Sequence, residues 1–84
     1  MKVEKEVNTM ERYKDINGDS GVIAYECGTD YIRVQFSTGA VYLYTNESAG
    51  SHNIEHMKAL ARSGDGLNAY ININVRKMYA RKER

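Results

Sequence analysis

Two histidines and a glutamate lie close together in the run His52-Asn53-Ile54-Glu55-His56. Two histidines four residues apart on a helix can hold zinc beside a catalytic glutamate, which is the pattern of one class of zinc peptidase. Such a site also needs a third protein ligand and a cleft that excludes water, and a small domain has little room for both. We therefore expect His52, Glu55 and His56 on the solvated face of a helix, and no metal site.

Three other motifs suggest chemistry, but each lacks a necessary part. Cys27 could be a nucleophile, yet nothing marks the oriented base and oxyanion site that a thiol hydrolase needs. Asp15-Ile16-Asn17-Gly18-Asp19 resembles a calcium loop, but its glycine comes too early and the final bidentate acid is missing. Gly64-Asp65-Gly66 could cradle a phosphate, but it follows a predicted helix instead of opening one. The sequence therefore predicts no catalytic residue, no cofactor and no enzyme activity.

Basic residues gather at the end of the chain, where they could contact phosphate groups. The segment from Arg76 to Arg84 holds five basic residues and one acid, whereas the net charge of the chain is only +1. This distribution argues against a binder held by overall charge and directs an anionic partner to the C-terminal end. A structural interpretation is equally open, since such residues favour a last helical turn and solubility. The candidate phosphate contacts are Arg76, Lys77, Arg81 and Lys82, with Asn72 and Asn74 giving hydrogen bonds nearby.

Size and composition place these residues in one small domain. Of the 84 residues, 42% are hydrophobic and 27% are charged, which is typical of a globular protein with a single core. Residues 1–12 mix charges without a clear period, so we predict a flexible tail there and one domain at 13–84. One cysteine excludes an internal disulfide framework, and no apolar run has the length of a signal-peptide core or a membrane span. We expect a cytoplasmic protein with no membrane partner.

Runs of period two predict three strands in the first half of the domain. Residues 21–26 follow a stretch dense in turn formers, and residues 31–36 alternate strictly between apolar and polar side chains. Residues 40–44 are rich in strand formers and follow the short loop Ser37-Thr38-Gly39, so the last two runs should pair as a hairpin. The expected product is a three-stranded antiparallel meander.

The period changes after Asn46, which predicts a helix. Ile54, Met57, Leu60 and Ala61 fall at spacings of three and four and share one helical face. Ser48 or Ser51 could cap the start of this helix, and Ser63-Gly64 should end it.

The last part of the domain is ambiguous. Ile71, Ile73 and Val75 alternate like a strand, while Ile71, Val75, Met78 and Tyr79 form a helical stripe. We prefer a helix from about Asn72 onward, because the stripe extends further and Arg and Lys are good helix formers. The predicted fold class is therefore α+β, with three strands followed by two helices (βββαα).

The hairpin loop decides which way Tyr42 and Tyr44 point, because a one-residue change of register sends every side chain to the opposite face. If Thr38-Gly39 is a two-residue loop, Phe36 pairs with Val41 and the two tyrosines lie outside. They would then form a platform on which RNA bases can stack.

The alternative is a three-residue loop over residues 37–39 with its glycine in the left-handed conformation. Phe36 then pairs with Ala40, and both tyrosines point into the core. This second register is favoured, since the spacing of the tyrosines matches that of Val34 and Phe36 and aromatic strand residues commonly pack inside.

In order along the chain, these pieces resemble the KTSC domain, which is named for the C-terminus of some lysyl-tRNA synthetases. The resemblance extends from about Ser20 to Tyr79. Its marks are Ile23 and Tyr25, the run Ile32-x-Val34-x-Phe36-x-x-Gly39, the pair Tyr42-x-Tyr44, the helix end Ala61-x-Ser63-Gly64, and Tyr70-Ile71-Asn72-x-x-Val75-Arg76-x-x-Tyr79. The resemblance implies an α+β fold, and the tRNA-charging enzyme that carries such a domain suggests a link to RNA.

Together, the basic end and the resemblance predict a non-enzymatic nucleic-acid-binding accessory module. RNA is the expected partner, and Tyr42 and Tyr44 join the basic residues as candidate contacts. The alternative is a protein-interaction module, such as a homodimer through an uncovered sheet face or edge, with no nucleic-acid role.

Overall fold

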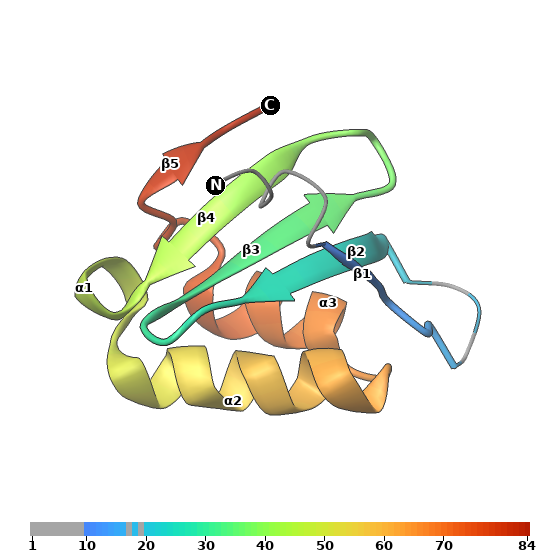
Figure 1. Cartoon of the computed structure of the whole chain (residues 1–84), viewed down its shortest axis with the longest axis horizontal. Helices are drawn as coiled ribbons and strands as arrows, with labels where there is room; N and C mark the ends of the chain where they lie inside the picture. Colours follow the sequence, from blue (N-terminus) through green and yellow to red (C-terminus); the bar gives the residue numbers. More distant parts are fainter. Residues whose placement is uncertain (1–9, 17, 19) are drawn as a thin grey trace, which may run out of the picture.

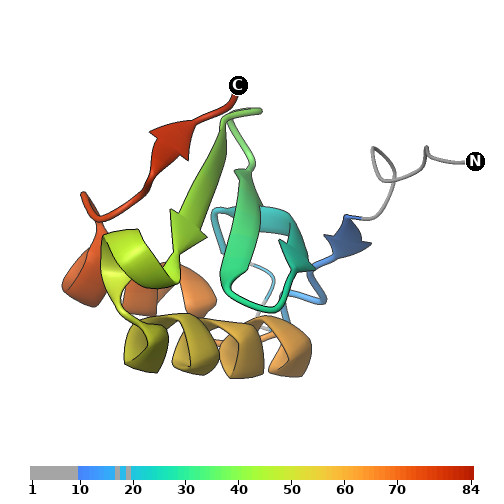
Figure 2. The ribbon, with the colours of Figure 1, turned by 60° about the vertical axis from the view of Figure 1, so that its left-hand side comes forward.

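The computed structural model describes residues 10–16, 18 and 20–84, and it has an antiparallel sheet packed on a layer of helices (Figure 1). The five strands lie in chain order and are β1 (Glu11–Arg12), β2 (Val22–Cys27), β3 (Tyr31–Phe36), β4 (Val41–Thr45) and β5 (Arg81–Lys82). Between β4 and β5 come the helices α1 (Asn46–Ala49), α2 (Ser51–Ser63), α3 (Leu67–Tyr70) and the π-helix η2 (Ile71–Val75). In Figures 1 and 2, α2 and α3 lie on the same side of the sheet. None of the helices in this described part of the chain combines the length and hydrophobicity needed to cross a membrane.

The α+β class and the antiparallel central strands are confirmed, whereas the βββαα layout is wrong. The structure adds a short strand at each edge of the sheet and has three α-helices. At the first edge, Glu11 and Arg12 pair with Tyr25 and Ala24, so two residues of the predicted tail 1–12 belong to the sheet. Residues 1–9 of the predicted tail lie outside the described residues.

The predicted helix from Asn72 onward begins too late and extends too far. Helical backbone starts at Leu67, directly after the left-handed Gly66, and ends at Val75. Leu67, Ile71 and Val75 are buried at spacings of four, whereas Ile73 is 80% exposed. The strand alternative for this segment is therefore also wrong, because the side chain that alternation would bury faces solvent.

After η2 the chain returns to the sheet and forms β5 beside β4. The backbone amide of Ala80 donates to the carbonyl of Leu43 at 2.6 Å, and the amide of Glu83 donates to the carbonyl of Val41 at 2.7 Å. These bonds cover the edge of β4 that a three-stranded sheet would expose. Met78 and Tyr79, which the helical prediction placed on a packed stripe, instead lie in the connection and are 46% and 39% exposed.

The hairpin between β3 and β4 has the favoured register. Phe36 and Ala40 face each other, with the Phe36 amide donating to the Ala40 carbonyl at 2.8 Å. Gly39 has φ +96°, a conformation that glycine reaches without steric cost, and its amide donates to the Phe36 carbonyl. The three-residue loop is therefore confirmed and the two-residue loop is wrong. Tyr42 and Tyr44 pair with Val34 and Ile32 on the helix-facing side of the sheet.

Helix α2 contributes Ile54, Met57 and Ala61 to the core. It ends at Gly64 in the left-handed conformation, as predicted, but neither Ser48 nor Ser51 caps its start. Ser48 instead forms a capping box with Thr45 at the start of α1, and Gly50 precedes α2 without a side-chain cap. The main core cluster comprises Tyr13, Val22, Tyr25, Ile32, Val34, Tyr44, Ala49, Ile54, Met57, Ala61, Leu67, Ile71 and Val75.

Candidate nucleic-acid interface

An open pocket of about 430 Å³ lies where the β3–β4 hairpin, β4, η2 and the segment before β5 meet. Its aromatic wall comes from both halves of the chain, and its rim carries basic and amide side chains. We call it the aromatic–basic pocket. The side chains that define it are Phe36, Tyr42, Tyr44, Asn72, Arg76, Lys77 and Tyr79.

The four rings of the pocket form a connected cluster. The centroid of the Tyr42 ring lies 5.7 Å from that of Phe36 and 4.7 Å from that of Tyr79, and the centroids of Tyr44 and Tyr79 are 6.4 Å apart. All three contacts are edge-to-face, which is a favoured geometry for aromatic pairs. Tyr44 is almost completely buried, whereas Tyr79 is 39% exposed and Tyr42 is partly buried. The cluster therefore joins the core at Tyr44 and reaches solvent at Tyr79.

The charge of the pocket is positive. Arg76 and Lys77 are exposed on its rim, and neither forms an ion pair with any residue that the structure describes. No acidic side chain occurs among the described residues that line the pocket. Lys82, on β5, adds a third cation, with its Nζ 6.0 Å from the centroid of the Tyr42 ring. An anion at this place would meet cations from two different segments.

The π-helix η2 sets the position of the rim. Ile71 and Val75 are buried and fix one side of the helix to the core, while Asn72 and Arg76 are exposed. Both of these exposed side chains line the aromatic–basic pocket. Because η2 ends at Val75, Arg76 and Lys77 begin the connection to β5 instead of continuing a helix. Single turns of π-helix are frequent at functional sites.

The structure brings together most of the residues predicted as nucleic-acid contacts. Tyr42, Tyr44, Asn72, Arg76 and Lys77 line the pocket, and Lys82 lies beside the Tyr42 ring. Asn74 is not among the lining residues, and its amide nitrogen donates to the carbonyl of Tyr70 at 3.2 Å. Arg81 is also separate, since side chains of neighbouring strand residues alternate and Lys82 takes the pocket side.

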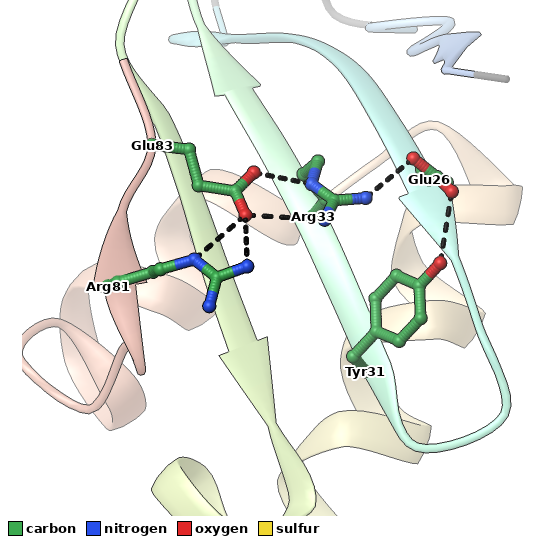
Figure 3. Close-up of polar contacts among 5 residues, drawn as sticks. All are labelled: Glu26, Tyr31, Arg33, Arg81 and Glu83. Carbon is green, nitrogen blue, oxygen red and sulfur yellow. Dashed lines mark hydrogen bonds and ion pairs between the residues drawn. The ribbon is translucent and has the colours of Figure 1, made fainter. Parts of the chain in front are cut away.

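Arg81 belongs to a polar network on the opposite face of the sheet (Figure 3). The Glu83 carboxylate accepts hydrogen bonds from Arg33 Nε at 2.5 Å and from Arg81 Nε at 3.1 Å. Arg33 also donates from Nη1 to Glu26 at 2.8 Å, and the Tyr31 hydroxyl donates to the same carboxylate at 3.0 Å. The hydrogen bond from Arg33 lowers the pKa of Glu83, and the Glu83 carboxylate raises the pKa of Arg33. This network, which we call the Arg33–Glu83 clasp, joins β2, β3 and β5.

The histidine pair on α2 and Cys27, which the sequence analysis rejected as functional sites, have the following surroundings. His52, Glu55 and His56 are exposed on α2, as predicted, and the ring of His56 stacks on Tyr70 with centroids 4.5 Å apart. Over the residues with described positions, no three histidine, cysteine or acidic side chains gather in a way that could hold a metal ion. Burial raises the pKa of the Cys27 thiol, which disfavours the nucleophilic thiolate.

Phe36 and Tyr79 are pocket residues that were not among the predicted contacts. The sequence could have predicted Phe36 as a pocket residue, because the three-residue loop that turns Tyr42 inward also places Phe36 on the same face. Tyr79 could not have been predicted in this way, since its position depends on the end of η2 and on the pairing of β5. A comparison of the chain with protein-family models, curated proteins and solved structures finds no match.

Proposed function

We propose that this domain is a non-enzymatic RNA-binding accessory module that holds single-stranded RNA at the aromatic–basic pocket. The observation that carries the proposal is the combination of accessible rings and unpaired cations in a pocket whose described lining has no acid. Aromatic side chains stack on unpaired bases, and Lys and Arg bind the phosphates between them. The resemblance to the KTSC domain supports the same partner, because that domain occurs on a tRNA-charging enzyme.

The experiment that tests the proposal is a salt series of binding curves with a labelled single-stranded RNA, read by fluorescence anisotropy. Replacing both rim cations, Arg76→Ala with Lys77→Ala, should weaken binding about tenfold and reduce the slope of log affinity against log salt by about 1.4. The matched control is Arg12→Ala with Arg62→Ala, which removes the same charge. Arg12 lies on the opposite edge strand, and Arg62 borders a separate pocket with Glu11 and Tyr25. Equal affinity and slope in all three proteins would contradict the proposal.

A second candidate function is a protein-interaction module, including self-association. Two exposed apolar side chains favour it, Ile73 at 80% and Met78 at 46% exposed, and both lie close in sequence to the basic rim. Size-exclusion chromatography with light scattering checks this candidate directly. A dimer that Ile73→Ser with Met78→Ser converts to a monomer, without RNA binding in the parent protein, would make it the better assignment.

A further inference from the structure

The seven tyrosines of the chain fall into two groups by what their hydroxyls bind. The hydroxyls of Tyr13, Tyr25, Tyr31 and Tyr70 each form a hydrogen bond within the protein. The hydroxyls of Tyr42, Tyr44 and Tyr79 form none with any residue of described position, and these three tyrosines are the ones that line the aromatic–basic pocket.

Tyr44 is the informative member of the second group. Tyr42 and Tyr79 are open enough to bind water, but Tyr44 is only 2% exposed. Among the described residues, the one fully buried side-chain oxygen or nitrogen without a partner is Asn46 Oδ1, so the Tyr44 hydroxyl keeps a small accessible surface, and the pocket that Tyr44 lines provides it. Burial also raises the pKa of Tyr44 to about 12, with a smaller contribution from Tyr42 and Tyr79, so the hydroxyl keeps its proton and can donate as well as accept. Its place in the pocket lining makes a bound ligand the natural partner.

Asn72 adds an exposed polar group at the rim of the pocket. Its side-chain amide has no hydrogen-bond partner among the described residues, whereas the Asn53 amide donates to the carbonyl of Ala49 and the Asn74 amide donates to that of Tyr70. An amide offers a donor and an acceptor together, which is the pattern that matches the edge of a nucleobase. The cations near the rings come from two segments, with Arg76 and Lys77 after η2 and Lys82 on β5.

We propose that the pocket accepts one unpaired nucleotide within an RNA strand and reads its base through the Tyr44 hydroxyl and the Asn72 amide. The base stacks on the exposed rings, and the phosphates on its two sides meet the two groups of cations. A duplex cannot present a base in this way, because its bases are stacked and paired. This inference rests on the proposed function and deepens it: the pocket confers base preference as well as affinity.

The test uses RNA strands that are abasic except for one central A, C, G or U, together with a fully abasic strand. The whole domain should bind one of the four bases at least about fivefold more tightly than the weakest, the size expected for one hydrogen bond of about 1 kcal/mol. Tyr44→Phe, which removes only the oxygen, should abolish most of this preference. The slope of its log affinity against log salt should match that of the parent protein, because the substitution removes no charge.

The matched control is Tyr70→Phe, which removes a hydroxyl that binds Asn53 outside the pocket. This variant should keep the base preference of the parent protein, and an amide NMR spectrum confirms that both variants are folded. Equal affinity for all four bases in the parent protein, or an unchanged preference in Tyr44→Phe, would overturn the inference. In either case a loss of binding in the Arg76 and Lys77 variant would still uphold the proposed function. Absence of binding to every strand would overturn both.

Discussion

Tyr13 and Tyr44 are equally buried, at 3% and 2% exposure, but their hydroxyls have different structural roles. The Tyr13 hydroxyl accepts a hydrogen bond from the backbone amide of Leu67 at 3.2 Å. Leu67 is the first residue of α3, so its amide has no partner within the helix and depends on this tyrosine. The Tyr44 hydroxyl supports no comparable contact, and removal of the two oxygen atoms should therefore have different effects on stability.

We expect Tyr13→Phe to lower the free energy of unfolding by about 1–2 kcal/mol, because it leaves the buried Leu67 amide unpaired. Tyr44→Phe should leave that free energy unchanged within about 0.5 kcal/mol, since it removes a hydroxyl that forms no hydrogen bond with the described residues and borders the open pocket. Urea denaturation of the two variants measures both quantities, provided that the denaturant slope is the same. A Tyr44→Phe variant as unstable as Tyr13→Phe would show that the hydroxyl has a structural partner in the folded protein.

The two alternatives considered for Tyr42 and Tyr44, core or binding platform, turn out not to exclude each other. Sequence periodicity correctly gives the face of the sheet, because Ile32 and Val34 fix the apolar side. It cannot show how far the helical layer covers that face. The layer ends with η2, so the tyrosines that point inward also line an open pocket.

At the scale of elements, strand β5 was not predicted from the sequence, yet it contributes side chains to both faces of the sheet. Its two residues, Arg81 and Lys82, point to opposite sides of the sheet, so the strand serves two purposes. Lys82 reaches the Tyr42 ring, while Arg81 and the following Glu83 join the Arg33–Glu83 clasp on the other face. The clasp therefore holds in place the strand that carries one of the pocket's cations.

The clasp should make the docking of β5 dependent on pH. Arg33 lowers the pKa of Glu83 in the folded protein, so the docked state binds fewer protons than the undocked state at intermediate pH. The stabilisation is thus fully present above the ordinary glutamate pKa of about 4.3 and is lost as pH falls through the lowered value. For Glu83→Gln we expect protection factors of the amides at Ala80 and position 83 to fall about twofold to fivefold at neutral pH, as for an exposed ion pair of about 0.5–1 kcal/mol.

Hydrogen exchange followed by NMR between about pH 3 and pH 7 measures these protection factors and separates the charge effect from backbone pairing. The parent protein should lose protection at Ala80 as the pH falls, whereas Glu83→Gln should show little further change. Glu47→Gln is the control, because Glu47 is exposed on α1 and takes no part in the clasp. The same pH dependence in the parent protein and in Glu83→Gln would rule out the clasp as its origin.

Elements with a hydrophobic period of their own could be predicted from the sequence, whereas strands that form only by pairing with the edge of a neighbouring strand could not. The strand at 31–36 and the helix ending at Gly64 are encoded by alternation, spacing and a left-handed glycine. Strands β1 and β5 have only two residues each, too few to show a period, and exist because β2 and β4 offer free edges. Arg81 lies outside the pocket for the same reason, because β5, and not a helix, sets its position.

At the scale of the whole molecule, charge and shape come from different parts of the chain. The three cations are close together in sequence, since Arg76, Lys77 and Lys82 all lie in the last nine residues. The walls of the pocket come instead from the β3–β4 hairpin, β4, η2 and the segment before β5. A short basic peptide therefore keeps most of the electrostatic attraction, while only the folded domain supplies the pocket.

A synthetic peptide of residues 71–84 separates these two contributions. It should bind single-stranded RNA with a salt slope close to that of the domain, because the slope depends on the number of phosphates neutralised. Its affinity should be at least about tenfold lower, since it lacks the rings of Phe36, Tyr42 and Tyr44, and stacking contributes about 1–3 kcal/mol per base. It should also show no preference among the four single-base strands, measured by the same anisotropy assay. A peptide that matched the domain in both affinity and base preference would show that the C-terminal segment binds RNA without the fold that surrounds it.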